Sequence, residues 1–255
     1  MRPGGLYREV RAVASTGSTN TDLTALGRHG AEPGALLVAE HQRQGRGRLD
    51  RTWQAPERAA VMFSVLLQPA RVPSGRWPWL PLLTGVAVAE GLWRAARADA
   101  RLKWPNDVLI DGRKVAGILV ERIDPGDRPP LAVVGVGINV SNTAAELPTA
   151  ESSSLALVGA STLDRSVILR TVCRTLESLY VAWCDQDGDP EAGLADSYRR
   201  RCSTLDLDLC IELPGHESMT GRAVDVDSSG RLVVACATGR VALSAGDVTH
   251  VRQPT

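Results

Sequence analysis

The sequence carries no net charge and almost no lysine. Lys plus Arg and Asp plus Glu both number 29, so no overall field draws the protein to nucleic acid or to an anionic membrane. Only two of the basic residues are lysines, Lys103 and Lys114, and they lie within twelve residues of each other. An ammonium is a compact point charge, which suits a small crowded anion better than the planar fork of an arginine. Any anion site is therefore local, and the two lysines are candidates for it.

Long apolar runs and paired cysteines are also missing. The N-terminus, MRPGGLYREV, reaches charged residues before an apolar run of signal-peptide length accumulates, and no stretch approaches the roughly 20 apolar residues of a membrane span. The five cysteines are an odd number without CxxC or Cys/His zinc spacing, so we expect them to be reduced and structural. These absences predict a cytoplasmic protein with no membrane contact.

Several common nucleotide-binding and catalytic signatures are absent. The chain contains no GxxxxGK[ST], no GxSxG and no HExxH, which excludes a P-loop, a nucleophile elbow and a zincin helix. GVGIN at 135–139 supplies only two of the three glycines of a dinucleotide fingerprint and lies late in the chain. The chemistry must therefore come from less familiar segments.

The chain is long enough for one large domain and a small one. At 255 residues and 44% apolar content it can bury a substantial core. The apolar patterns predict helices over 18–30, 79–97, 164–186 and 190–201, and strands over 34–40, 60–68, 106–110, 114–123 and 131–140. From about residue 205 the chain consists of short strand-like runs with turn signals, typical of a small β-barrel or sandwich. We expect an α+β protein with domains at 1–204 and 205–255.

Three segments combine glycine, charge and amide in ways that packing alone does not require. HQRQGRGRLDRTWQ at 41–54 brings together four arginines, Arg43, Arg46, Arg48 and Arg51. Glycine backbone and guanidinium groups are suited to phosphate oxygens, although a nucleic-acid contact or a solvated loop would use the same residues. KWPND at 103–107 and RKVAGILVE at 113–121 each carry one of the two lysines, and Asp111-Gly112 between them predicts a hairpin turn.

In this order the segments resemble the motifs of biotin protein ligases. The resemblance rests on STN at 18–20, Gln42 with GRGRLDR at 45–51 and Trp53, KWPND, RKVAGILVE and GVGIN. It covers nearly the whole chain and implies a class II synthetase-like mixed sheet with helices, followed by an SH3-like β-barrel. Asp50 departs from the family, whose loop often has glycine there. About seventeen residues precede STN, too few for a helix-turn-helix, so we expect the ligase-only class without DNA binding.

The resemblance also implies a two-step reaction. Biotin and MgATP would give biotinoyl-AMP and pyrophosphate, and biotin would then pass to one lysine of the biotin carboxyl carrier domain of an acyl-CoA carboxylase. A carboxylate that attacks an α-phosphate needs cations to offset the repulsion between the two anions. The acyl-adenylate is prone to hydrolysis, so a closing loop must exclude water. The arginines of 43–51 are expected to form that loop.

The family's site residues carry over to matching positions. The catalytic residues implied are Lys114, Arg48 and Lys103. Biotin contacts are implied for Ser18, Thr19, Asn20, Gln42, Gly45, Arg46, Gly47, Arg48, Lys114 and Gly117. Nucleotide contacts are implied for Arg46, Arg48, Arg51, Trp53, Lys103, Asn106 and Asn139. Asp107 is a candidate to bind Mg²⁺ or to orient Lys103.

Two alternative functions remain open at this point. A lipoate-type protein ligase would share the implied catalytic fold and adenylate chemistry. A non-enzymatic nucleic-acid binder would use the arginine loop on phosphates, but the neutral charge and the lack of a basic face argue against it.

Overall fold

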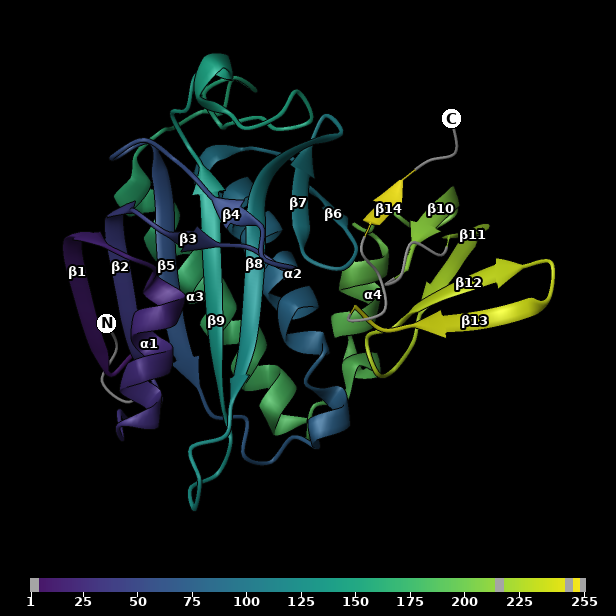
Figure 1. Cartoon of the computed structure of the whole chain (residues 1–255), viewed down its shortest axis with the longest axis horizontal. Helices are drawn as coiled ribbons and strands as arrows, with labels where there is room; N and C mark the ends of the chain where they lie inside the picture. Colours follow the sequence, from purple (N-terminus) through teal and green to yellow (C-terminus); the bar gives the residue numbers. More distant parts are fainter. Residues whose placement is uncertain (1–4, 214–217, 246–249, 253–255) are drawn as a thin grey trace.

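The computed structural model describes residues 5–213, 218–245 and 250–252. These form two main β-sheets and a small two-stranded one, with helices around the largest sheet (Figure 1). The larger sheet has seven strands in the order β1-β2-β5-β9-β8-β7-β6. Its strands are β1 (Glu9–Thr16), β2 (Ala35–Gln42), β5 (Ala60–Leu67), β6 (Arg101–Lys103), β7 (Asp107–Ile110), β8 (Arg113–Ile123) and β9 (Leu131–Asn139). Only β1 and β2 pair in parallel, so the sheet is mixed, and the expected α+β class is confirmed.

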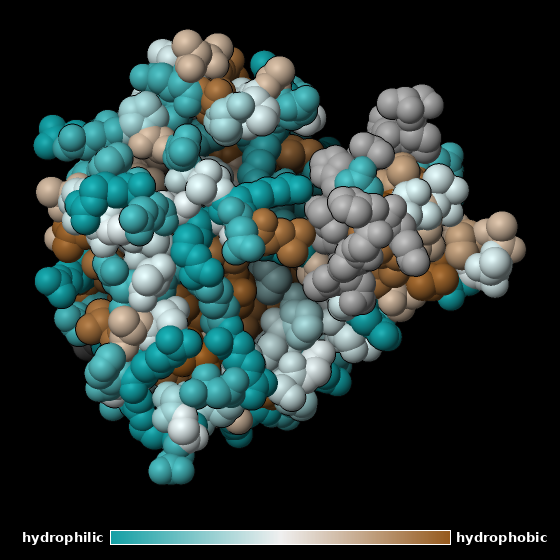
Figure 2. All heavy atoms as spheres, viewed as in Figure 1, coloured by the Kyte–Doolittle hydropathy of each residue, from teal (hydrophilic) through white to brown (hydrophobic). Residues whose placement is uncertain are grey.

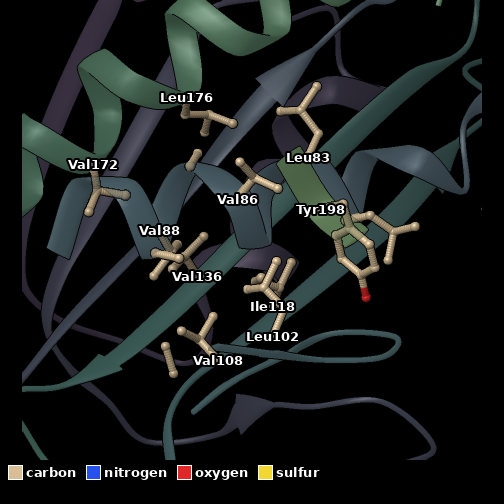
Figure 3. Close-up of a cluster of buried hydrophobic side chains, with 14 of the residues drawn as sticks. Leu83, Val86, Val88, Leu102, Val108, Ile118, Val136, Val172, Leu176 and Tyr198 are labelled. Atoms are coloured by element: carbon tan, nitrogen blue, oxygen red, sulfur yellow. The ribbon is translucent and has the colours of Figure 1, made fainter. Parts of the chain in front are cut away.

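Two long helices cover the back of this sheet. α2 (Trp79–Ala96) and α3 (Arg165–Asp185) pack against each other, and Asp164 caps α3 by accepting hydrogen bonds from two backbone N–H groups. Figure 3 shows apolar side chains of both helices, such as Val86 and Leu176, which belong to one buried cluster with Ile118 of β8. The short elements η3 (Pro190–Ala192) and α4 (Leu194–Arg199) follow. Gly193, with φ of 115°, separates them, so the single helix expected over 190–201 is wrong in this detail.

The front of the sheet is covered differently at its two ends. α1 (Thr19–Arg28) packs over one end, where Leu23 meets Leu131 and Val133 of β9. Over the other end runs a two-stranded hairpin of β3 (Gly45–Arg46) and β4 (Thr52–Trp53), which Figure 1 shows crossing in front of the sheet. The outer surface of this side is mainly hydrophilic, with apolar side chains visible in its recesses (Figure 2).

The local signals in the sequence predicted most of these elements. Ser18 is the N-cap of α1, with its side chain accepting a hydrogen bond from the Thr21 N–H. Ile110 pairs with Arg113, and Asp111 and Gly112 both have positive φ, as the two-residue hairpin turn requires. β1 and β6 were not expected. β1 is an edge strand with largely exposed side chains, so it lacks the apolar alternation that marks a half-buried strand.

The smaller sheet is the SH3-like β unit expected at the C-terminus. Its strands are β10 (Asp208–Glu212), β11 (Ser218–Val226), β12 (Leu232–Cys236), β13 (Gly239–Leu243) and β14 (His250–Arg252). They pair antiparallel in the order β13-β12-β11-β10-β14.

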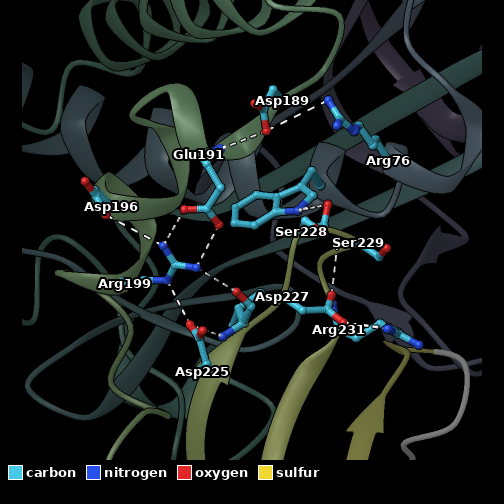
Figure 4. Close-up of polar contacts among 12 residues, drawn as sticks. Arg76, Asp189, Glu191, Asp196, Arg199, Asp225, Asp227, Ser228, Ser229 and Arg231 are labelled. Atoms are coloured by element: carbon cyan, nitrogen blue, oxygen red, sulfur yellow. Dashed lines mark hydrogen bonds and ion pairs between the residues drawn. The ribbon is translucent and has the colours of Figure 1, made fainter.

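The two sheets share one apolar cluster and a polar seam. The indoles of Trp79 and Trp104 are almost fully buried and donate hydrogen bonds to the carbonyls of Ser228 (3.0 Å) and Gly230 (3.1 Å) in the β11–β12 turn. Beside them, Arg199 of α4 bonds both Glu191 and Asp225, which raises its pKa, with the Glu191 hydrogen bond the largest cause (Figure 4). The boundary near residue 204 therefore stays a prediction, because buried side chains from both sides of it belong to one cluster.

Within these described ranges no helix is long and apolar enough to cross a membrane. The five cysteines are free, as expected.

Candidate active site

The β3–β4 hairpin and the front of the sheet enclose a pocket. Ser18, Thr19 and Asn20 reach it from the start of α1, and Gln42 from the end of β2. The hairpin contributes Arg46, Gly47, Arg48, Arg51 and Trp53, and the sheet contributes Asn106, Asp107, Lys114 and Gly117. Thirteen of the sixteen residues expected in the site therefore line one pocket, although they come from segments a hundred residues apart.

The hairpin turn explains the glycine that the family often has at position 50. Gly45 pairs with Trp53, Arg46 pairs with Thr52, and the Gly47 N–H donates to the Arg51 carbonyl at 2.6 Å. The turn that closes this loop gives Asp50 a φ of 57°. Glycine adopts this left-handed conformation freely, and aspartate is among the residues that tolerate it best. The departure at Asp50 therefore keeps the loop's path and leaves Arg51 in the pocket lining.

Short polar side chains form the end of the pocket next to α1. Thr19 donates from both its backbone N–H and its hydroxyl to Gln42 Oε1, at 2.7 and 3.0 Å. Ser64 Oγ of β5 lies 2.7 Å from Thr19 Oγ1 and 2.6 Å from Asn20 Oδ1. Ser18, Thr19 and Asn20 are all almost fully buried. This network holds small donors and acceptors at fixed positions, an arrangement suited to a compact polar ligand group.

Two glycines of β9 make room for the pocket side chains. A Cβ on Gly135 would lie 2.0 Å from Asn20 Oδ1, and a Cβ on Gly137 would lie 2.4 Å from the Trp53 ring. The same face of β9 carries Leu131 and Val133 where it packs under α1. The pair of glycines in GVGIN is therefore explained by close approach to side chains, not by a dinucleotide turn.

A β-bulge turns Lys114 toward the pocket. Val108 of β7 pairs with Ala116 and Leu109 pairs with Lys114, so Val115 is an extra residue in β8. Val115 and Ala116 are both buried on the helix side. In a regular strand Lys114 and Gly117 would face opposite sides of the sheet, but the extra residue puts both on the front.

The cations of the pocket have defined partners. Lys114 Nζ lies 2.5 Å from Asp107 Oδ1, and Arg46 Nη1 lies 2.7 Å from Glu121 Oε1. Arg48 donates to Asn106 Oδ1 at 3.3 Å and to the carbonyl of Ala245 in the C-terminal unit. Burial lowers the pKa of Arg48, although Asp107 acts in the opposite direction. Arg48 thus contacts both the large sheet and the C-terminal unit.

Three expected site residues do not line the pocket, and their roles stay predictions. Asn139 is buried below it, where its amide donates to the Ser153 carbonyl at 3.0 Å. Gly45 belongs to β3 of the hairpin, where a Cβ would be 2.3 Å from the Trp53 carbonyl oxygen. Lys103 is half-buried on β6, where it pairs directly with Asp107, a pocket residue of β7.

Asp107 lies close to Lys114 and not in a cluster of ligands. Within the ranges described above, no group of three or more His, Cys, Asp or Glu side chains could hold a metal ion. The Mg²⁺ role of Asp107 stays a prediction. Asp107 was also expected to orient Lys103, but the ion pair that it forms is with Lys114.

Four residues that shape the pocket were missed in the sequence. Ser64 sits in an apolar strand and gave no signal, because a single serine in a buried run is common. Glu121 closes the RKVAGILVE motif but was given no role. Gly135 and Gly137 were noted only as an incomplete fingerprint, and their spacing of two was the available signal that both face the same side of a strand.

Comparison with known proteins agrees with this architecture. Residues 12–139 match the biotin/lipoate A/B protein ligase family, and residues 211–251 match the biotin protein ligase C terminal domain. The biotin–[acetyl-CoA-carboxylase] ligase of Mycobacterium tuberculosis is 40% identical over 98% of this chain and 91% of its own length. The bifunctional ligase/repressor BirA of Bacillus subtilis is 30% identical over 95% of this chain and 73% of its own.

A solved structure shows the same fold. The biotin protein ligase from Aquifex aeolicus in complex with biotin and ATP superimposes with a TM-score of 0.81 at 25% identity, covering 97% of this chain and 100% of that one. The matches extend over both sheets and over every motif that lines the pocket. The chain therefore belongs to the biotin/lipoate A/B protein ligase family.

Proposed function

We propose that the protein joins biotin to ATP as biotinoyl-AMP and then transfers the biotinyl group to one lysine of the biotin carboxyl carrier domain of an acyl-CoA carboxylase. The observation that carries the proposal is the convergence of two different kinds of group on one pocket. Small neutral donors and acceptors lie at the α1 end, and Lys114 with three arginines lies toward the hairpin. A ligand with a compact polar head and an anionic end fits this order of groups.

In the first step a carboxylate oxygen of biotin forms a bond to the α-phosphorus of ATP, and the bond to the departing pyrophosphate breaks. Both reactants are anions, so the barrier falls when fixed cations lie between them. Lys114 is placed for this because its ammonium lies on the front of the sheet beside Gly117, where no Cβ blocks the approach. An anionic ligand would take the place of Asp107 as the partner of this ammonium.

The hairpin then has to keep water from the acyl-adenylate. Its arginines reach over the pocket, and Trp53 lies across Gly117 and Gly137 on the floor. In the second step the amine of the acceptor lysine attacks the biotinyl carbonyl, AMP leaves, and the nitrogen loses a proton. The hairpin must open enough to admit one lysine side chain, while the cations continue to hold the phosphate.

Biotin is the proposed substrate in preference to lipoate. The M. tuberculosis relative, which matches 98% of this chain, is named as a biotin ligase, and the A. aeolicus structure is titled as a complex with biotin and ATP. The network of Thr19, Gln42 and Asn20 supports the same choice, because a ureido ring needs several short donors and acceptors, whereas the dithiolane ring of lipoate offers none of comparable strength.

Mg²⁺ enters the proposal as part of the nucleotide substrate. Mg²⁺ in nucleotide sites usually binds phosphate oxygens, water and one or two carboxylates. Asp107 is the carboxylate beside Lys114 that could contribute. We place the reaction in the cytoplasm, where ATP is available and the five free cysteines would stay reduced.

The test is incubation of the protein with MgATP, a carrier domain and either biotin or lipoate, with the carrier mass as the readout. We expect the mass to increase by one biotinyl group, with no gain from lipoate and none when the acceptor lysine of the carrier is replaced by arginine. Exclusive modification by lipoate would reverse the substrate assignment. No modification by either acid, in a protein that also fails to exchange pyrophosphate into ATP, would refute the proposed function.

A further inference from the structure

Glu121 occupies a position on the front of the sheet that the proposed reaction leaves without a role. After the bulge, Gly117, Leu119 and Glu121 of β8 follow one another on the front face. Gly117 and Leu119 line the pocket, and Glu121 stands at its rim, between the start of α1 and the hairpin. A carboxylate at the rim of a site for anionic substrates repels them, so its presence there needs a reason.

The two oxygens of this carboxylate bind two different parts of the site. Oε1 accepts a hydrogen bond from Arg46 Nη1 of the hairpin at 2.7 Å. Oε2 accepts one from the Asn20 amide nitrogen at 2.9 Å. Glu121 is therefore a bridge from the hairpin side of the pocket to its polar end at α1.

The Asn20 contact decides which way that amide points. Asn20 Oδ1 accepts from the Ser64 hydroxyl at 2.6 Å, and Nδ2 donates to Glu121 and, at 3.3 Å, to the Leu119 carbonyl. A flipped amide would set its oxygen against the carboxylate and the carbonyl, two groups that can only accept. Because Gly135 leaves no further space beside Asn20, the side chain cannot move away to relieve this. Glu121 thus fixes both the position and the polarity of the amide.

The Arg46 contact is the weaker of the two. The Arg46 side chain is 47% exposed and that of Glu121 is 25% exposed. An ion pair this close to solvent contributes little to stability. Asn20, by contrast, is only 4% exposed, so a lost hydrogen bond there is not replaced by water. The main effect of Glu121 on the site must pass through Asn20.

We infer that Glu121 is a positioning residue, which orients the Asn20 amide for the polar head of biotin and ties Arg46 of the hairpin to that amide. The inference rests on the proposed function and adds a determinant of biotin affinity. Glu121 touches neither reacting atom, so it acts on binding more than on the chemical step. The orientation of Asn20 for biotin and the position of Arg46 in the hairpin are linked, because both depend on the same Glu121 carboxylate.

The test replaces the carboxylate by an amide of the same size. Glu121→Gln keeps one acceptor oxygen, so the side chain can serve Arg46 or Asn20 but not both. We expect the KM for biotin in biotin-dependent ATP–pyrophosphate exchange to rise about tenfold, as for loss of one buried charge-assisted hydrogen bond. The kcat at saturating biotin should change less than about threefold. Release of free biotinoyl-AMP should also increase, because Arg46 is held less firmly.

Asp124→Asn is the matched control. Asp124 follows the same strand and accepts hydrogen bonds from Arg122 Nε (3.0 Å) and Nη2 (2.8 Å), but it lies outside the pocket lining. The Asp124→Asn substitution therefore removes an arginine-paired carboxylate without affecting Asn20, and we expect wild-type kinetics. Thermal unfolding of both variants should stay close to wild type, which separates loss of orientation from loss of fold.

A second variant tests the direction of the hydrogen bond. Asn20→Asp alone places two carboxylates against each other and should weaken biotin binding strongly, as measured by calorimetry. Adding Glu121→Gln restores a donor opposite an acceptor, so the double variant should bind biotin more tightly than Asn20→Asp. Equal or weaker binding by the double variant, or a KM for Glu121→Gln equal to that of Asp124→Asn, would refute the role of Glu121. A wild-type protein without biotin-dependent exchange would instead refute the proposed function.

Discussion

Replacing Lys114 by arginine tests whether the pocket needs an ammonium or only a positive charge. The Lys114 side chain runs beside Gly117, where a Cβ would lie 3.2 Å from Lys114 Cε and 3.3 Å from Nζ. Its ammonium ends 2.5 Å from Asp107 Oδ1. A guanidinium is wider than an ammonium and carries its charge farther from the backbone. In the narrow space beside Gly117, the guanidinium of an arginine at position 114 has to displace either β8 or Asp107.

The expected loss follows from this geometry. A shift of about 1 Å in a positioning group can cost about 100-fold in rate, and removal of one preorganised stabilising donor costs about 10² to 10³. We therefore expect Lys114→Arg to fold normally and to lose about two to three orders of magnitude in biotin-dependent ATP–pyrophosphate exchange. Arg113→Lys is the matched control, because Arg113 is exposed at the hairpin turn and lies outside the pocket. Exchange by Lys114→Arg within about threefold of wild type would remove Lys114 from the catalytic residues.

A substitution tests the packing around the pocket, and a truncation tests the packing between the two main sheets. Gly135→Ala should fold but lose at least about tenfold in biotin affinity by calorimetry, since its Cβ would overlap Asn20, whereas Gly75→Ala, with nothing within 4 Å, should be silent. Truncation after Thr204 should lower the melting temperature by about 5 °C or more, because about 2 kcal/mol of lost burial around Trp104 shifts it by that much in a domain of this size. An unchanged melting temperature would instead establish 1–204 as an independent domain.

Thiol reactivity distinguishes Cys236 of β12 from Cys173 of α3 in one measurement. Hydrogen bonding to Thr238 lowers the pKa of Cys236, so this thiol should react with iodoacetamide at a lower pH than an ordinary cysteine. Burial raises the pKa of Cys173 to about 12, so Cys173 should react only after unfolding. Peptide mass mapping of briefly labelled native protein checks both expectations, and early labelling of Cys173 would contradict its burial.

The elements that could be predicted from the sequence are those fixed by neighbouring residues. The Ser18 cap, the Asp111-Gly112 turn and the apolar spacing of α3 each lie within a few residues of what they determine. β1 could not be predicted, because its strand conformation depends on parallel pairing with β2, and its exposed side chains carry no pattern. The strands of the C-terminal sheet could be predicted from short strand-like runs in the sequence. The contact of this sheet with the rest of the core could not, because it depends on Trp79 and Trp104, which come from distant segments.

The candidate site divides in the same way. The residue types and their motifs were in the sequence, but the orientation of Lys114 depends on an extra residue in β8 that no local signal marked. The closeness of Lys103 and Lys114 in the chain suggested a shared site, yet only Lys114 lines the pocket. Glu121 and Arg46 are 75 residues apart, and only the fold of the hairpin over the sheet brings them together.

The arginine-rich loop is explained by the distribution of charge within the pocket. Two cations of the pocket each lie against a carboxylate: Arg46 contacts Glu121, and Lys114 contacts Asp107. A pocket that gathered cations without such partners would repel itself and hold its hairpin away from the sheet. In the proposed reaction, substrate carboxylate and phosphate groups replace Asp107 at Lys114, while Glu121 keeps Arg46 near the rim. The neutral composition of the whole chain and the basic character of this loop are thus consistent, because two of the pocket cations, Arg46 and Lys114, are balanced by acids whose positions the fold determines.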